Sequence, residues 1–290
     1  MSIDRNAIDE PLVRALLAEQ FPEWAGMPIR PVEHSGNDHR MFRLGDDLSV
    51  RLPADTGYVP QVQKEQTWLP RLRDAVPLPI PEVRGAGVAS SLFAAPWSVY
   101  GWLDGRPAAL EPVADRARFA ADLAAFLVAL RGVDATDGPP PGQHSAYRGA
   151  PLAHFDDETR AILHRVHGRE RDLAAGIWSD ALDAGFDGPP AWLHGDVSIN
   201  NLLVRDGRLV GVVDFGCSAV GDTACDTVLL WTWLTGDARE TWRRELGVDD
   251  ATWARGRGWA LWKALIMITN TPPGQAEFAR RVLDELFAGV

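Results

Sequence analysis

Residues 192–216, WLHGDVSINNLLVRDGRLVGVVDFG, constrain the fold of this chain more than any other stretch. Asp206-Gly207 is a strong signal for a two-residue type I′ turn, and the apolar runs on both sides are typical of paired strands. With this turn, Asn201 pairs with Val212 and shares one face of the hairpin with Asp214 as a diagonal neighbour. The stretch therefore predicts a β-hairpin that brings an amide and a carboxylate together.

The polar residues of this hairpin have chemistry that no strand requires. Asn201 and Asp214 offer hard oxygen ligands of the kind that Mg²⁺ prefers, with positions left for water and phosphate oxygens. Asp196, in the loop that leads into the hairpin, is placed to orient or accept the proton of an attacking hydroxyl. Separate structural roles in a turn, a loop and a strand end are the alternative, but the spacing of all three residues argues against it.

The remaining pattern predicts an α+β chain with two lobes. Short alternating runs over 28–52, broken at Gly45-Asp46-Asp47, indicate strands joined by a hairpin, and a helix over 62–75 is expected to be interrupted by Pro70. Helical spacing predominates beyond Asp104. We expect a small β-rich N-terminal lobe over 1–102 and a larger, mainly helical C-terminal lobe over 103–290. Helices are expected near 9–20, 114–132, 155–168, 169–184, 222–235, 238–246, 251–270 and 274–288.

Charge and composition restrict the partners. The chain of 290 residues has 40 acidic and 29 basic side chains and a net charge of −11, which argues against binding to nucleic acid or an anionic membrane and would suit a cationic small molecule. The N-terminus lacks the pattern of a signal peptide, and no apolar run is long enough to cross a bilayer. Two cysteines cannot form a disulfide framework, so we expect a cytoplasmic protein.

Acidic residues also occur along the C-terminal helices. They would suit an amine-bearing ligand, although most of them are expected on solvated helix faces. They are Glu240, Glu245, Asp249, Asp250, Glu277 and Asp284.

Two other catalytic classes do not match. Residues 216–221, GCSAVG, have the wrong spacing for a nucleophile elbow, and no P-loop pattern occurs. His164 and His167 are suitably spaced on a predicted helix to share a metal, but no third ligand accompanies them, which favours surface histidines.

His194-Gly195-Asp196, Asn201 and Asp214-Phe215-Gly216 together resemble the catalytic pattern of the protein-kinase-like fold. The His-Gly-Asp variant is similar to the aminoglycoside phosphotransferase and choline kinase branch, and GDTACDTVLLWTWL and RGRGWALWKAL extend the likeness. The resemblance implies that Asp196 is the catalytic base, that Asn201 and Asp214 bind Mg²⁺, and that His194 braces the catalytic loop.

The resemblance also implies a nucleotide site in the N-terminal lobe. SGNDHRMFRLG resembles the turn that covers the phosphates, with Ser35, Gly36 and Asn37 near its tip, and backbone groups around Gly101–Leu103 would face the base. Arg51 stands where the family usually has a phosphate-binding lysine; it stays charged and grips phosphate with a different geometry. Glu65 is either its ion-pair partner or part of a solvated helix face, whereas Lys64 is less suitably oriented for phosphate.

The function implied is transfer of the γ-phosphate of ATP or GTP to a small-molecule hydroxyl, as in aminoglycoside O-phosphotransferases. Other acceptors on the same scaffold remain open: a macrolide or other antibiotic, an amino alcohol, a sugar amine or homoserine. A nucleotide-binding pseudoenzyme is a further alternative, which only the arginine at position 51 supports.

Overall fold

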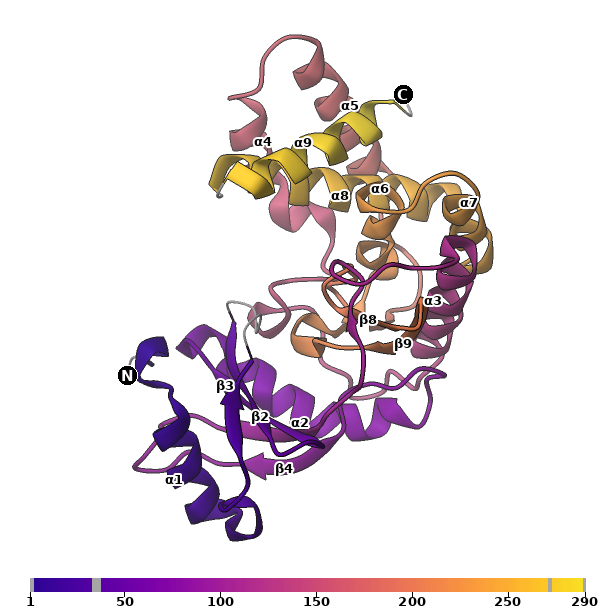
Figure 1. The fold of residues 1–290 in the computed structure, drawn as a ribbon. Coiled ribbons are helices and arrows are strands. Elements are labelled where there is room, and N and C mark those ends of the chain that lie inside the picture. Colours follow the sequence, from indigo (N-terminus) through magenta and orange to yellow (C-terminus); the bar gives the residue numbers. More distant parts are fainter. Residues whose placement is uncertain (1–2, 33–37, 271–272, 289–290) are drawn as a thin grey trace.

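The computed structural model describes residues 3–32, 38–270 and 273–288. The first part of the chain forms an antiparallel five-stranded sheet in the order β1-β2-β3-β5-β4, flanked by helices α1 (Glu10–Gln20) and α2 (Val59–Arg73) (Figure 1). Its strands are β1 (Ile29–Pro31), β2 (His39–Leu44), β3 (Leu48–Pro53), β4 (Val83–Gly87) and β5 (Trp97–Gly101).

Strand alternation divides the sheet into an apolar and a polar face. Val50 of β3 and Val99 of β5 belong to the apolar core that α1 covers. Because successive side chains on a strand point to opposite faces, Arg51 and Tyr100 point the other way. They reach Glu65 of α2 there. The alternation therefore places a charged cluster between the sheet and α2.

Helix α2 corrects one expectation, because it runs from Val59 to Arg73 without a break at Pro70. A proline inside a helix removes one backbone hydrogen bond, so the neighbouring turns must be held by packing. Leu69 and Leu72 supply it, since each is almost completely buried in the main hydrophobic core.

The second part of the chain is mainly helical (Figure 1). Its helices are α3 (Arg116–Arg131), α4 (Asp156–Leu163), α5 (Arg169–Asp183), α6 (Leu229–Thr232), α7 (Gly236–Glu245), α8 (Asp250–Asn270) and α9 (Pro273–Phe287). Two small sheets have the strand orders β6-β8-β9 and β10-β7, and Figure 1 shows β8 and β9 between the five-stranded sheet and the C-terminal helices. Their strands are β6 (Arg106–Pro107), β7 (Ala191–Leu193), β8 (Leu202–Arg205), β9 (Arg208–Val212) and β10 (Ala219–Gly221).

Two predicted helices are shorter than expected. Helix α4 ends at Leu163, and the segment predicted as one helix over 222–235 is a 3₁₀ helix, Thr223–Val228, followed by the short α6. The physical reason in the second case is local. Asp222 accepts a hydrogen bond from the Ala224 N–H, and Asp226 accepts hydrogen bonds from the N–H groups of His194 and Gly195, so these residues follow side-chain contacts instead of a regular helix.

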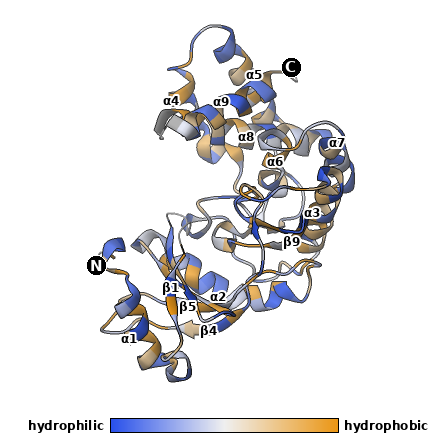
Figure 2. Cartoon of the chain, viewed as in Figure 1, coloured by the Kyte–Doolittle hydropathy of each residue, from blue (hydrophilic) through white to orange (hydrophobic). Residues whose placement is uncertain are grey.

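Two hydrophobic cores correspond to the two lobes. One lies between α1 and the five-stranded sheet, and the other fills the helical part and extends to α2 and Tyr100. Hydrophilic and hydrophobic residues share each helix (Figure 2), as expected where one side packs on a core. The α+β, two-lobed architecture predicted from the sequence is confirmed.

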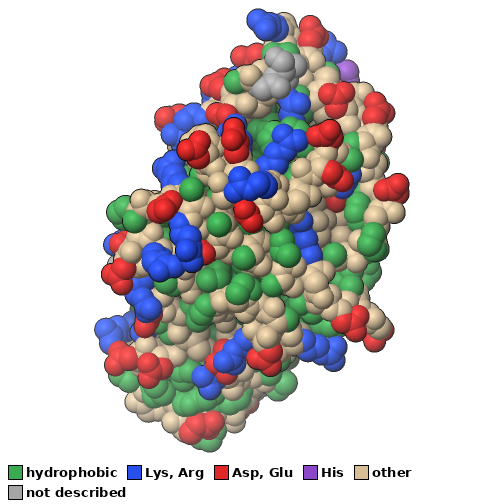
Figure 3. Space-filling model, turned by 90° about the vertical axis from the view of Figure 1, so that its right-hand side faces the viewer, with side chains coloured by type: hydrophobic (Ala, Val, Ile, Leu, Met, Phe, Trp, Pro, Cys, Tyr) green, Lys and Arg blue, Asp and Glu red, His purple; other side chains and the backbone are tan. Residues whose placement is uncertain are grey.

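The face of the molecule in Figure 3 is mixed in charge. Acidic and basic side chains are interspersed over the face in Figure 3, without an extended area of one sign. Within the described ranges, no helix is long and apolar enough to cross a membrane.

Candidate active site

The hairpin β8-β9 has the predicted two-residue turn. Asp206 and Gly207 both adopt left-handed backbone conformations, with φ of 52° and 73°, and Arg205 pairs with Arg208. A type I′ turn requires positive φ at both central residues, which is why Asp-Gly is favoured there.

The predicted register is wrong beyond the first pairs. Leu202 lies opposite Val212, and the Val213 N–H donates to the Asn201 carbonyl at 2.9 Å, so Asn201 faces Val213 instead of Val212. The shift arises because β9 holds one extra residue between Leu209 and Gly211, a bulge that two paired turn residues do not reveal.

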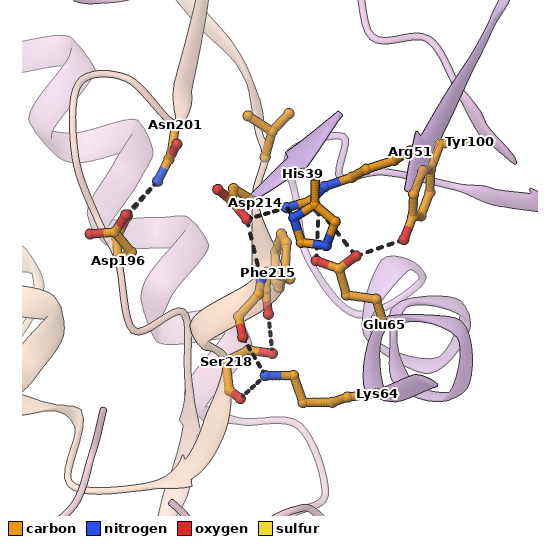
Figure 4. A network of polar contacts seen from close by, with 12 residues as sticks. His39, Arg51, Lys64, Glu65, Tyr100, Asp196, Asn201, Asp214, Phe215 and Ser218 are labelled. Atoms are coloured by element: carbon orange, nitrogen blue, oxygen red, sulfur yellow. Dashed lines mark hydrogen bonds and ion pairs between the residues drawn. The ribbon is translucent and has the colours of Figure 1, made fainter. Parts of the chain in front are cut away.

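Asp214 reaches the site by its backbone conformation and not by strand alternation. Its φ and ψ of 66° and 72° are left-handed, which ends the strand and turns the side chain. Figure 4 shows its carboxylate turned toward the pair formed by Asp196 and Asn201. The three residues singled out in the sequence therefore do converge, by a different route from the one predicted.

Asn201, a candidate metal ligand, is hydrogen-bonded to Asp196, the candidate catalytic base. Its Nδ2 donates to both the backbone oxygen and Oδ2 of Asp196, each at 3.0 Å (Figure 4). Because the amide nitrogen is committed, the amide oxygen of Asn201 is left for another partner.

The loop before the hairpin is held by buried groups. The carboxylate of Asp226 accepts hydrogen bonds from the His194 and Gly195 N–H groups at 2.9 and 2.7 Å, and His194 contacts the Val213 carbonyl and the Asp196 N–H. Gly195 has φ of 83°, and a Cβ there would lie 2.2 Å from the Cys217 carbonyl oxygen. These contacts explain the His-Gly-Asp sequence, and His194 does brace the loop as expected.

Lys263 of α8 is a site residue that the sequence reading missed. Its Nζ lies 2.8 Å from Asp196 Oδ1. Burial by itself would raise the pKa of Asp196, but the charge and hydrogen bond of Lys263 hold it well below its ordinary value. Asp196 is therefore ionised and fixed at both carboxylate oxygens.

Arg51 is the centre of the charged cluster under the sheet (Figure 4). Its Nη1 donates to both oxygens of Glu65 at 3.0 and 3.1 Å, and its Nη2 donates to Asp214 Oδ1 at 2.8 Å and contacts His39 Nδ1 at 3.0 Å. Tyr100 donates to Glu65 at 2.6 Å. Glu65 is 2% exposed, so it is an ion-pair partner and not part of a solvated helix face.

The cluster fixes two protonation states. Burial disfavours the charge of Arg51, yet Glu65 and Asp214 raise its pKa above the ordinary value. Burial, and then the charge of Arg51, lower the pKa of His39 to about 2. Arg51 is thus a permanent cation and His39 a neutral acceptor beside it.

Lys64, which was expected to be less suitably oriented for phosphate, contacts backbone carbonyls instead. Its Nζ donates to the carbonyls of Gly216 and Ser218, both at 2.7 Å, and of His144 at 3.2 Å. It joins α2 to the segment after Asp214 and does not face the charged cluster (Figure 4).

The predicted base-binding linker is only partly available. The Gly101 N–H donates to the Glu82 carbonyl and the Trp102 N–H to the Asp47 carbonyl, whereas the Leu103 N–H makes no hydrogen bond to any described residue. A cavity of about 470 Å³ lies against Gly101–Leu103. Its other walls come mainly from residues 76–80 and it contains no catalytic candidate, so it lies apart from the chemistry. Ser35, Gly36 and Asn37 lie outside the described residues.

Three residues near the site were not predicted from the sequence: His39, Arg148 and Lys263. Only His39 could have been found from a local sequence pattern. His39 lies two residues before Met41, the strand partner of Arg51, so period-two alternation would have put His39 on the Arg51 face. Arg148 and Lys263 gave no such signal, because they approach Asp196 from a loop and a helix far away in the sequence.

A two-lobed fold with Asp196, Asn201 and Asp214 at the junction defines a kinase-like phosphotransferase class. The family model described as the phosphotransferase enzyme family matches residues 28–259, and the chain belongs to this family.

The similar proteins are consistent with this family assignment. The chain is 40% identical to the aminoglycoside 3'-phosphotransferase of Escherichia coli over 45 residues, and this match spans 16% of the chain and 17% of that protein. The GDP and kanamycin complex of APH(2″)-IIia has a TM-score of 0.77 at 18% identity, over 96% of this chain and 98% of that one. Macrolide 2'-phosphotransferase MphH from Brachybacterium faecium has a TM-score of 0.64 at 20% identity, over 94% and 97% of the two chains.

Proposed function

We propose that this protein is a Mg²⁺-dependent small-molecule kinase that transfers the γ-phosphate of ATP or GTP to a hydroxyl group. The observation that carries the proposal is the convergence of an ionised, doubly held Asp196 with Asn201 and Asp214, while Asp214 is tied to Arg51 of the sheet. Phosphoryl transfer needs positioning and charge stabilisation more than covalent chemistry, and this arrangement supplies both.

Asp196 acts on the acceptor. Its Oδ1 accepts from Lys263 and its Oδ2 from Asn201, and each oxygen keeps capacity for a further hydrogen bond. The acceptor hydroxyl donates to this carboxylate, which aligns the hydroxyl oxygen and accepts its proton. As the new bond to the γ-phosphorus forms, the bond from this phosphorus to the bridging oxygen breaks and the nucleoside diphosphate leaves with that oxygen.

The donor set at the junction suits a hard cation. The amide oxygen of Asn201 and the carboxylate of Asp214 are hard oxygen ligands, and no three His, Cys, Asp or Glu side chains of the described residues gather as a metal site. Two protein ligands leave room for water and phosphate oxygens, which is how Mg²⁺ is usually held with nucleotides. Bound there, Mg²⁺ would offset the charge of the phosphates.

The two lobes divide the work. Residues 1–102 bind the nucleotide and residues 103–290 provide Asp196 and the acceptor side. Both terminal nitrogens of Arg51 are engaged with protein groups, so Arg51 contacts phosphate through Nε or by exchanging its bond to Asp214. Leu103 offers the base its free N–H, with Gly101 beside it, and the turn with Ser35, Gly36 and Asn37 covers the phosphates. Glu65 holds Arg51 in place. The enzyme works in the cytoplasm, where nucleoside triphosphates are available.

The acceptor panel follows from the neighbours. The solved structures of similar fold include complexes with kanamycin, gentamicin and streptomycin and a macrolide phosphotransferase. Aminoglycosides and macrolides therefore come first, followed by amino alcohols, sugar amines and hydroxy acids.

The test is acceptor-dependent release of ADP or GDP in the presence of Mg²⁺, with Asp196→Asn as the inactive variant. Loss of a general base typically lowers the rate by about 10²–10⁴-fold. Asp187→Asn, at an exposed aspartate elsewhere, is the matched control and should retain the full rate. An Asp196→Asn rate equal to that of the wild type would sink the catalytic assignment, and nucleotide binding without turnover of any acceptor would favour the pseudoenzyme.

A further inference from the structure

Two cations, Lys263 and Arg148, border the Asp196 carboxylate. A small cavity beside Asp196 is lined by Arg148, Lys263, Trp259 and Trp262, among others, and Asp196 is the one carboxylate among its lining residues. The cavity is too small for an acceptor. Its walls nevertheless show which groups surround this side of the Asp196 carboxylate.

Lys263 compensates the negative charge of Asp196. The two side chains form an ion pair at 2.8 Å, and both are only partly exposed, at 25% and 32%. The carboxylate therefore has little unbalanced charge with which to attract an amine on the acceptor.

Arg148 forms no ion pair with a described residue, although its charge also contributes to the lowered pKa of Asp196. Its guanidinium lies 4.5 Å from the centre of the Trp262 ring, its Nη1 is buried, and its side chain makes no hydrogen bond to any described residue. A buried donor without a partner is costly, and the planar guanidinium matches a carboxylate with two parallel hydrogen bonds. The Nε and Nη2 atoms are not buried in this way, so they form the edge of the guanidinium that a carboxylate can reach.

The loop that presents Arg148 is strained and is held by contacts within the loop and with His154. Ala146 and Tyr147 both have positive φ, 48° and 57°, which is unfavourable for side chains other than glycine. The Tyr147 ring stacks on His154 with centroids 4.0 Å apart, and backbone bonds link the Tyr147 and Arg148 N–H groups to carbonyls within the loop. Strain of this kind persists where the surrounding structure enforces it, so Arg148 is held in place before a ligand binds.

The acidic residues that would suit a polycation lie elsewhere. All six are exposed and none lines the cavity beside Asp196; they are Glu240, Glu245, Asp249, Asp250, Glu277 and Asp284. Glu245 and Asp250 pair with neighbouring arginines, and Asp249 accepts a hydrogen bond from the Thr252 N–H at the start of α8. These six residues lie in solvent-exposed positions, as expected for most of them.

We propose that Arg148, beside the Lys263–Asp196 pair, forms an anion-binding acceptor subsite, and that the physiological acceptor is an alcohol that carries a carboxylate near the phosphorylated hydroxyl. This inference rests on the proposed function. It distinguishes this chain from kinases of polycations, because a polyamine would meet Arg148 and Lys263 as like charges.

The experiment uses three alcohols with one carbon skeleton and different charge: 3-hydroxybutyrate, 3-hydroxybutyramide and 3-hydroxybutylamine, with kanamycin as a polycation. Their binding to the protein loaded with Mg²⁺ and ADP or GDP is measured by ligand-observed NMR titration, which needs no turnover and so separates this test from that of the proposed function. The kcat/KM ratios are then measured with ATP and GTP.

The variants isolate the guanidinium. Arg148→Met removes the charge and Arg148→Lys keeps it. Arg116→Met is the matched control, because Arg116 also lies over a tryptophan, 4.8 Å from the Trp233 ring, but on α3 and away from the cavity. Thermal melting confirms that each variant is folded.

We expect the carboxylate to bind at least about tenfold more tightly than the amide, as one charge-assisted pair predicts. Arg148→Met should abolish this preference, while Arg148→Lys retains part of it and Arg116→Met all of it. Equal binding of carboxylate and amide, no binding of the carboxylate, or tightest binding of kanamycin would overturn the proposal. So would an Arg148→Met variant that slows transfer to all acceptors equally with binding unchanged, because the anion would then be the transferred phosphoryl group.

Discussion

His39 should make the stability of this protein sensitive to mild acid. Its ring is 1% exposed, its Nδ1 accepts a hydrogen bond from Arg51, and its Nε2 is buried with no hydrogen-bond partner among the described residues. A proton on Nδ1 would break that bond and put a second cation beside Arg51. Burial and Arg51 therefore lower the pKa of His39 from 6.5 to about 2.

The sign and size of the effect follow from proton linkage. Between pH 6.5 and 2 the unfolded histidine binds a proton that the folded one does not, so the free energy of unfolding falls as the pH falls. Each pH unit below 6.5 costs about 1.4 kcal/mol, which amounts to about 2 kcal/mol between pH 7 and pH 5.

His39→Asn is the perturbation, because its amide oxygen can accept the Arg51 hydrogen bond without titrating. Urea unfolding at pH 7, 6 and 5 gives the difference in unfolding free energy between wild type and variant at each pH. That difference should shift in favour of the variant by about 2 kcal/mol from pH 7 to pH 5.

The comparison of wild type with His39→Asn at each pH cancels the contributions of the other titrating groups, because both proteins contain them. Burial raises the pKa of Asp226, for example, and its protonation acts in the opposite direction, but this group is present in both proteins. His167→Asn, at an exposed histidine, is the control and should leave the pH dependence unchanged. Parallel curves for wild type and His39→Asn between pH 7 and pH 5 would refute the assignment of a neutral, buried His39.

Two further substitutions test the cluster and the connection between α2 and the segment after Asp214. Arg51→Lys supplies one nitrogen where Arg51 uses two to contact Glu65, Asp214 and His39, so we expect about 1–3 kcal/mol lower unfolding free energy in urea; an unchanged value would contradict the bridging role. Lys64→Met tests the opposite pH range, because burial lowers the pKa of Lys64 from 10.5 to about 8. Above pH 8 the unfolded lysine binds the extra proton, so wild-type stability relative to the variant should rise by about 2–3 kcal/mol between pH 8 and pH 10, and a flat difference would show that Lys64 stays charged.

Local patterns predicted much of the fold and the core of the site. The Asp206-Gly207 turn, the two-lobed order of strands and helices, and the grouping of Asp196, Asn201 and Asp214 are all present. Each depends on backbone preferences or spacings over a few residues. For Glu65 the sequence allowed either an ion pair with Arg51 or a place on a solvated helix face. The burial of Glu65 decides for the ion pair.

The predictions that were wrong share a cause, because each depended on tertiary contacts that local sequence does not show. The bulge in β9 and the left-handed Asp214 depend on how the hairpin fits its surroundings, and the turn residues carry no signal for either. Pro70 did not end α2 because the packing of Leu69 and Leu72 overrides local propensity.

The sequence by itself determined the class of chemistry, because an aspartate, an asparagine and a second aspartate at these spacings around a tight hairpin require only short-range geometry. The tertiary structure alone decided the charges that surround them. Arg51 meets Asp214 across 163 positions, and Lys263 meets Asp196 across 67. Such contacts depend on the packing of whole elements, and they set the protonation of Arg51 and Asp196.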